Sequence, residues 1–173
     1  MLSGTVSTVF GDDINTDDII PAVYLQQSDD PAFFAAYAFV RYDAQFRSRS
    51  AQHAGNVVVA GKNFGCGSSR EQAVYALQQN HVACVIAESF PDIFYRNSLA
   101  NGLPLITLAD RSGLQLGDQI EVDLDAGLLH NRTRNSSLPF QMKTEDRRTF
   151  SAGGMTARVR AHLEELLTGQ QSR

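Results

Sequence analysis

Cysteine is scarce in this chain of 173 residues, which contains only Cys66 and Cys84. Neither belongs to a Cys-x-x-Cys pair or stands beside clustered histidines. Zinc and iron–sulfur centres normally need three or four such ligands, so we expect this chain to bind no metal of its own. The two cysteines are expected to be free thiols.

Charge bias and long hydrophobic runs are also lacking. Fifteen basic side chains oppose 19 acidic ones, for a net charge of −4, and the signs are mixed along the chain. This distribution offers no field that would attract nucleic acid or an anionic membrane. No window approaches the roughly 20 apolar residues of a membrane span, and the N-terminus lacks a signal-peptide pattern. We therefore expect a cytoplasmic protein with neither nucleic acid nor membrane as partner.

Strand and helix patterns alternate through the middle of the chain. Hydrophobic residues make up 43% of the sequence, enough for one core without disulfides. The pattern predicts strands at residues 5–10, 57–60, 82–87 and 103–108, and helices at 69–79 and 91–102. A run rich in alanine and aromatic residues predicts one further helix over 31–46. Strands that alternate with helices favour a parallel sheet with helices packed against it.

The pattern changes to hairpins beyond residue 111. Strands are expected at residues 119–124 and 127–130. A final amphipathic helix over 156–167 carries Val159, Leu163, Leu166 and Leu167 on one face. No repeat or linker interrupts the chain. We predict a single compact α/β domain, 1–173, with a mixed and mostly parallel sheet. Residues 1–110 form its core, and 111–173 form an antiparallel extension whose role the sequence leaves open.

Residues 61–71 form a glycine-rich segment between a predicted strand and a predicted helix. Ser68 and Glu71 fit a capping box at the start of that helix. A helix N-terminus offers free N–H donors, and Arg70 adds a planar guanidinium suited to a carboxylate or phosphate. The segment is therefore either an anion-binding turn or simply a tight connection with a good cap.

The spacing of the glycines argues against a nucleotide. Lys62 precedes them, whereas a Walker A motif places its lysine after them, and the G-x-G-x-x-G spacing is absent. We predict that the turn centred on Gly65, Cys66 and Gly67 binds a small carboxylate.

Two side chains in this turn could be reactive. Cys66 could have a lowered thiol pKa near a helix N-terminus, but no histidine or acid lies near it in the sequence. A nucleophilic Cys66 is thus an alternative hypothesis. Ser68 can act as a general base only where its alkoxide is strongly stabilised, and helix-terminal amides beside Arg70 would provide such an environment.

Four ordered segments carry a resemblance to a known family. They are residues 11–21 (Gly-Asp-Asp-Ile-Asn-Thr-Asp-Asp-Ile-Ile-Pro), 61–71, 87–97 and 101–105. Their order and spacing resemble the small-subunit family of 3-isopropylmalate dehydratase. That family is similar to the swivelling C-terminal domain of aconitase and to the small subunit of homoaconitase. The resemblance covers roughly residues 3–110.

The resemblance implies one half of a two-chain hydro-lyase. A large subunit would hold a four-iron, four-sulfur cluster, and this chain would close over the site as a lid. By position in the motifs, Ser68 would take the proton from carbon, while Ser69 and Arg70 would bind a substrate carboxylate. Asp17 would handle a proton or orient the site, although the acidic turn around it could also be merely solvated.

The resemblance also implies that one loop binds the substrate and distinguishes its side group. This loop carries Tyr24, Leu25, Gln26 and Gln27.

Three features, at four positions, depart from the family pattern. Val23 is apolar where many members have a basic residue, Gln26 and Gln27 are neutral amides, and Gln72 replaces a histidine. Amides neither pair with an extra carboxylate as arginine does nor form an apolar pocket. The resemblance favours interconversion of 2- and 3-isopropylmalate in leucine biosynthesis. Homoaconitate, citraconate or a methylated malate remain open as substrates, as does a non-catalytic dicarboxylate-binding module.

Overall fold

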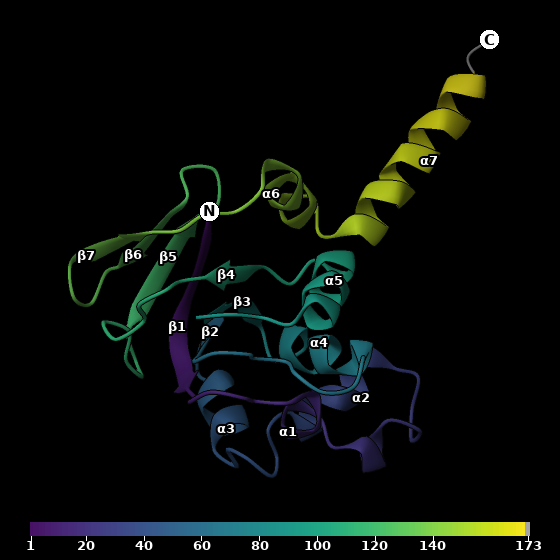
Figure 1. Ribbon diagram of the computed structural model, residues 1–173. Coiled ribbons are helices and arrows are strands. Elements are labelled where there is room, and N and C mark those ends of the chain that lie inside the picture. The colour runs from purple at the N-terminus through teal and green to yellow at the C-terminus, as the bar shows by residue number, and fades with distance from the viewer. Residues whose placement is uncertain (172–173) are drawn as a thin grey trace.

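Seven strands form one mixed sheet in the order β4-β3-β2-β1-β5-β6-β7, in a computed structural model that describes residues 1–171 (Figure 1). Strands β1 to β4 are parallel, and β5, β6 and β7 join antiparallel on the other side of β1. The strands are β1 (Leu2–Val9), β2 (Asn56–Ala60), β3 (Val82–Ala87), β4 (Leu105–Thr107), β5 (Gln119–Asp123), β6 (Leu128–Asn131) and β7 (Ser136–Pro139). The predicted α/β class with an antiparallel extension is confirmed.

The helices between the parallel strands pack against one face of the sheet, and further helices come after the last strand in the sequence. They are α1 (Thr16–Ile19), α2 (Pro31–Phe34), α3 (Phe46–Ser50), α4 (Glu71–Gln78), α5 (Asp92–Asn101), α6 (Thr144–Ser151) and α7 (Met155–Gln171), with 3₁₀ turns η1 (Ala22–Tyr24) and η2 (Ala35–Tyr37). Helix α6 and strand β7 were not predicted. Among the described residues, no helix is long and apolar enough to cross a membrane.

The prediction of one helix over residues 31–46 is wrong. The chain forms α2 and η2, then turns at Phe39, whose φ is 53° and whose N–H donates to the Ile19 carbonyl at 2.9 Å. Phe34, Phe39 and Phe46 are all buried. Apolar periodicity reports which side chains are buried, and here a turning backbone buries the same residues that a helix would.

Both faces of the central strands are buried. In β2, Val58 and Ala60 face one core with the helices α1 to α5, whereas Val57 and Val59 face a second core. The C-terminal extension covers this second face, to which Phe140 contributes. Double burial explains why β2 is continuously apolar instead of alternating.

A buried carboxylate ties the extension together at the start of β5. Asp118 is 2% exposed, and its Oδ2 accepts from Arg134 Nε at 2.8 Å, Asn131 Nδ2 at 2.8 Å and the Gln115 N–H at 2.9 Å. Burial alone would raise the pKa of Asp118, but these hydrogen bonds hold it below its ordinary value of 3.8. Asp118 therefore stays ionised in the folded protein at neutral pH.

We expect Asp118→Asn to lower the free energy of unfolding by about 1–3 kcal/mol at pH 7, because three donors lose their charged acceptor. Urea denaturation measures this, and exposed Asp125→Asn is the control. The folded-state pKa lies below the unfolded value, so the contribution is complete above about pH 4 and is lost as pH falls through the folded pKa. Equal stability of both variants at pH 7 would contradict this role.

Candidate functional site

The turn after β1 and the glycine-rich turn after β2 are joined by backbone hydrogen bonds. Gly65 N–H donates to the Ile14 carbonyl at 2.7 Å, and Thr16 N–H donates to the Cys66 carbonyl at 2.8 Å. Because β1 and β2 are neighbouring parallel strands, their carboxyl ends meet at one edge of the sheet, where ligands of α/β proteins commonly bind. Two segments about fifty residues apart thus form one surface.

Side-chain hydrogen bonds hold the two predicted serines in this surface. The Thr16 hydroxyl, on a residue only 2% exposed, donates to the Ser68 carbonyl at 2.9 Å. From α5, Asn97 Nδ2 donates to Ser69 Oγ at 3.2 Å. No site role was predicted for Thr16 or Asn97, although they lie within the 11–21 and 87–97 motifs.

The turn presents unused donors to solvent. Within residues 1–171, nothing accepts from the backbone N–H of Gly67, Ser68 or Ser69, and all three residues are exposed. The Ser68 hydroxyl likewise has no partner in this part of the chain. Successive free amides form a concave set of partial positive charges that suits an anion. The region predicted to bind a carboxylate is therefore chemically able to do so.

These amides belong to a loop and not to the first turn of a helix. Helix α4 begins at Glu71, with Arg70 extended at its N-cap and no side-chain cap, so the predicted Ser68–Glu71 capping box is absent. The Glu71 carboxylate instead accepts from the Tyr75 hydroxyl at 3.0 Å. The extended turn results from the contacts that Thr16 and Asp17 make with it across the surface.

Arg70 is fixed by Asp17. Arg70 Nη1 donates to Asp17 Oδ1 at 2.7 Å and to the Ile20 carbonyl at 3.1 Å, while Asp17 Oδ1 also accepts from the Ala22 N–H at 2.8 Å. The hydrogen bond from Arg70, followed by that from Ala22, lowers the pKa of Asp17. Asp17 is therefore an ionised anchor and a weak base. Arg70 Nε and Nη2 have no partner in the described chain and can bind a carboxylate.

The predicted specificity loop begins beside this ion pair. Tyr24 stacks on Tyr37 with ring centroids 3.8 Å apart, and Leu25 packs against the core. Gln27 Nε2 donates to the Val23 carbonyl at 2.8 Å. Three of the four predicted binding residues thus shape the loop. The Gln26 side chain is exposed and, within the described residues, unpartnered.

Cys66 lies in surroundings unlike those of a reactive thiol. Its Sγ is 3.6 Å from the Asp13 carbonyl oxygen. Partial burial and the negative charge of Asp13 raise the pKa of Cys66, so the thiolate is disfavoured at neutral pH. Geometry therefore argues against the nucleophilic alternative.

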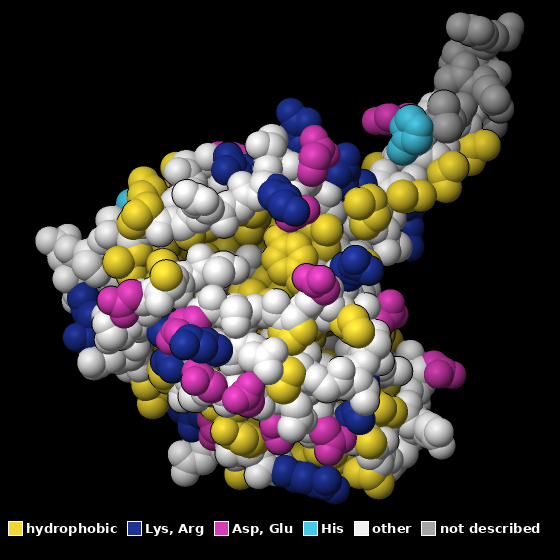
Figure 2. All heavy atoms as spheres, in the orientation of Figure 1, with side chains coloured by type: hydrophobic (Ala, Val, Ile, Leu, Met, Phe, Trp, Pro, Cys, Tyr) yellow, Lys and Arg dark blue, Asp and Glu magenta, His cyan; other side chains and the backbone are white. Residues whose placement is uncertain are grey.

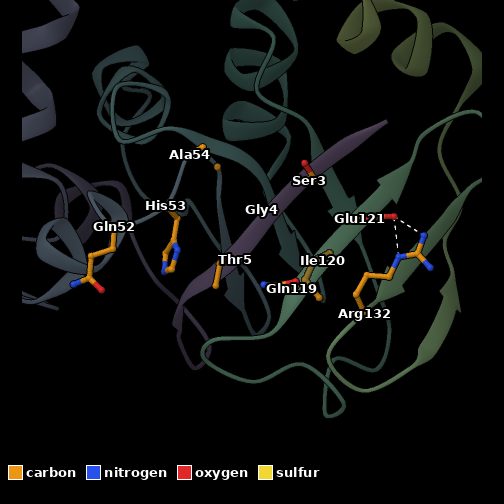
Figure 3. A pocket seen from close by; sticks show the side chains of 11 residues that line it. Ser3, Gly4, Thr5, Gln52, His53, Ala54, Gln119, Ile120, Glu121 and Arg132 are labelled. Carbon is orange, nitrogen blue, oxygen red and sulfur yellow. Dashed lines mark hydrogen bonds and ion pairs between the residues drawn. The ribbon is translucent and has the colours of Figure 1, made fainter.

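The candidate site is an open surface, distinct from a cavity of about 350 Å³ elsewhere (Figure 3). That cavity lies at the amino ends of β1 and β2, between Gly4, His53 and the ion pair of Arg132 with Glu121. None of the predicted site residues lines it. Across residues 1–171, no three His, Cys, Asp or Glu side chains are grouped so as to hold a metal ion.

Residues 1–111 match the sequence profile described as the aconitase C-terminal domain. The chain belongs to this family. Within it, the chain is 41% identical to the 2,3-dimethylmalate dehydratase small subunit of Eubacterium barkeri, over 88% of this chain and 93% of that protein. It is also 41% identical to the 3-isopropylmalate dehydratase small subunit of Caldicellulosiruptor saccharolyticus, over 89% of this chain and 88% of that protein.

A solved structure of similar sequence has the same fold. The structure of 3-isopropylmalate dehydratase from Methanocaldococcus jannaschii aligns with a TM-score of 0.86 and 36% identity, and covers 98% of each chain. The family resemblance drawn from the four motifs is confirmed. The alignment also spans the C-terminal extension, which the family profile does not reach.

Proposed function

We propose that this chain is the small subunit of a two-chain hydro-lyase that removes water from a malate derivative and adds it back. The observation that carries the proposal is the joined pair of turns, which presents Ser68 and, next to Arg70, three backbone N–H groups without an acceptor in the described residues. Relatives at about 41% identity are named dehydratase small subunits. An open surface with these groups suits a lid that a second chain completes.

Each residue of this surface has a distinct part in the proposed reaction. Arg70 binds a substrate carboxylate through Nε and Nη2, while Asp17 keeps its guanidinium in place. Ser68 removes the proton from carbon, and the amides around it stabilise the negative charge that its oxygen carries. Ser69, oriented by Asn97, provides a further donor to the carboxylate.

A four-iron, four-sulfur cluster on the large subunit would supply Lewis-acid activation of the substrate hydroxyl. This chain offers no ligand set for such a cluster among its described residues, and its Cys84 is buried in β3. We therefore assign the cluster to the partner.

The substrate that we propose is isopropylmalate, and a methylated malate is the alternative. One relative acts, by its name, on 2,3-dimethylmalate and another on 3-isopropylmalate, at the same identity to this chain. In the loop that follows the Asp17–Arg70 ion pair, the exposed Val23 and Gln26 offer an apolar group and a neutral amide, and neither pairs with a third carboxylate. This favours an alkyl-substituted malate over homoaconitate. The assignment to leucine biosynthesis and the cytoplasmic location remain predictions. The division of the chain into a core and an extension at residue 110 also remains a prediction.

Reconstitution tests the proposal. The full chain is mixed with a cluster-loaded large subunit, and the assay follows dehydration of isopropylmalate and dimethylmalate and hydration of citraconate and homoaconitate. We expect no turnover by either chain alone and turnover of an alkylmalate by the pair. A chain that binds a dicarboxylate in calorimetry but assembles with no cluster-bearing subunit would instead identify a binding module. Turnover by this chain without a partner would overturn the two-chain proposal.

A further inference from the structure

Helix α7 is firmly anchored at its first turn. Gly102 ends α5 with a left-handed φ of 77°, and a Cβ there would lie 2.3 Å from the Gly153 carbonyl carbon. The backbones are therefore in direct contact. Arg158 Nη1 donates to the Thr149 hydroxyl of α6 at 2.6 Å and lies 3.9 Å from Glu145. Beyond this turn α7 extends away from the sheet (Figure 1).

An apolar stripe runs along the projecting part of α7. Its residues recur every four positions and are exposed: Met155 44%, Val159 51%, Leu163 53% and Leu167 64%. Figure 2 shows hydrophobic side chains in a row on this helix. A helix of this length gains most of its stability from packing an apolar face, but α7 packs against α5 and α6 while Val159, Leu163 and Leu167 stay exposed. The stripe therefore indicates a contact with another molecule.

Charged side chains beside the stripe indicate which partner fits it. Arg160 and Glu164 are one turn apart on the same flank of α7, next to Leu163. When two such helices pair antiparallel about a two-fold axis at Leu163, identical flanks meet, and each Arg160 approaches the other copy's Glu164. A parallel pair brings opposite flanks together and places Arg160 near His162. Along the antiparallel pair the order is Arg160, Glu164 of the second copy, Glu164, and Arg160 of the second copy, so the two glutamates lie beside the axis and each has the other copy's arginine on its outer side.

We propose that α7 is a self-association surface, through which two copies of this chain pair antiparallel. Leu163 packs on its counterpart at the two-fold axis, and Val159 packs on Leu167. Ridges of residues spaced by four on both helices interlock at a crossing angle of about 50°. A helix of 17 residues is only about 25 Å long, so the contact is small and we expect micromolar self-association.

The position of α7 separates this surface from the candidate site. Helix α1, which carries Asp17, lies at the lower edge of Figure 1, whereas α7 projects from the upper right. The candidate site and α7 therefore lie on different parts of this chain. The inference does not depend on the proposed function.

The first test measures the mass of the full chain by sedimentation at tens to hundreds of micromolar. We expect a concentration-dependent dimer. Leu163→Glu should raise its dissociation constant about 100-fold or more, because a dimer loses two central leucines and gains two facing carboxylates. Leu116→Glu is the matched control, since Leu116 is similarly exposed (56%) but lies outside α7. A monomer at all concentrations, or a Leu163→Glu dimer of unchanged strength, would overturn the proposal.

A charge-reversal mixture tests the antiparallel arrangement. Arg160→Glu and Glu164→Arg should each weaken self-association, because each places like charges on the facing flanks. An equimolar mixture should form heterodimers, because two glutamates then face two arginines. If the mixture associates no more strongly than either variant alone, the antiparallel pairing is wrong. If the wild-type chain is a monomer and Leu163→Glu weakens binding to a large subunit, α7 belongs to that interface and the proposal is wrong.

Discussion

Replacing Ser68 by alanine is expected to lower kcat of the reconstituted two-chain enzyme by about 10²–10⁴-fold, the usual contribution of a positioned general base. The substrate KM and the assembly of the two chains should change little. Within residues 1–171, the Ser68 hydroxyl holds no other group in place, and the turn is fixed by the Ser68 carbonyl, which the variant retains. Steady-state kinetics with saturating large subunit measure both parameters.

Ser69→Ala is the matched control for this experiment. Ser69 is adjacent and also exposed, but its hydroxyl accepts from Asn97 and is proposed to contact the carboxylate. We expect Ser69→Ala to raise KM more than it lowers kcat. Full kcat in Ser68→Ala would remove Ser68 from proton transfer. A loss of kcat accompanied by failure to assemble would show that Ser68 supports the interface instead.

The Gly65→Ala exchange is expected to lower the free energy of unfolding by about 2–5 kcal/mol, which combines a left-handed backbone with overpacking. Gly65 has a φ of 85°, and a Cβ there would lie 2.2 Å from Phe94 Cγ. Phe94 is 1% exposed and packs edge-on against Phe64, so its ring has no room to move away. Relief requires the turn itself to shift.

Gly113→Ala provides the control for this exchange, because no atom lies within 4 Å of a Cβ at Gly113 and its φ is not positive. Chemical denaturation of both variants compares the two sites. We expect Gly113→Ala to stay within about 0.5 kcal/mol of wild type. Gly65→Ala should also reduce turnover, since a shift of the turn moves Ser68 and its free amides. Equal stability of the two variants would show that Phe94 adapts and the turn is not constrained.

Strong local patterns identified the regular elements. The continuously apolar residues of β2 and β3 could only form buried strands, and the alternation with α4 and α5 favoured parallel pairing. The four ordered motifs identified the family and pointed to Ser68, Arg70 and Asp17, because chemistry of this kind requires particular residue types at particular spacings. Such features depend on neighbours within a few residues of one another.

Contacts between distant segments could not be derived in this way. The sequence predicted a helix over 31–46 and a capping box at Ser68, and both are absent because burial of Phe39 and contacts from Thr16 override local preference. Asp17 and Arg70 are 53 positions apart, so their pairing depends on the adjacency of β1 and β2.

The sequence alone determined the class of fold, the family and the residue types available for catalysis. It also predicted that two cysteines are too few to ligate an iron–sulfur cluster. Only the tertiary structure decided that Asp17 is an ionised anchor, that the donors of the turn have no acceptor within residues 1–171, and that Val159, Leu163 and Leu167 of α7 are exposed. Hydrogen bonding and burial depend on which distant groups the folded chain brings within a few ångströms, and local residue patterns do not contain that information.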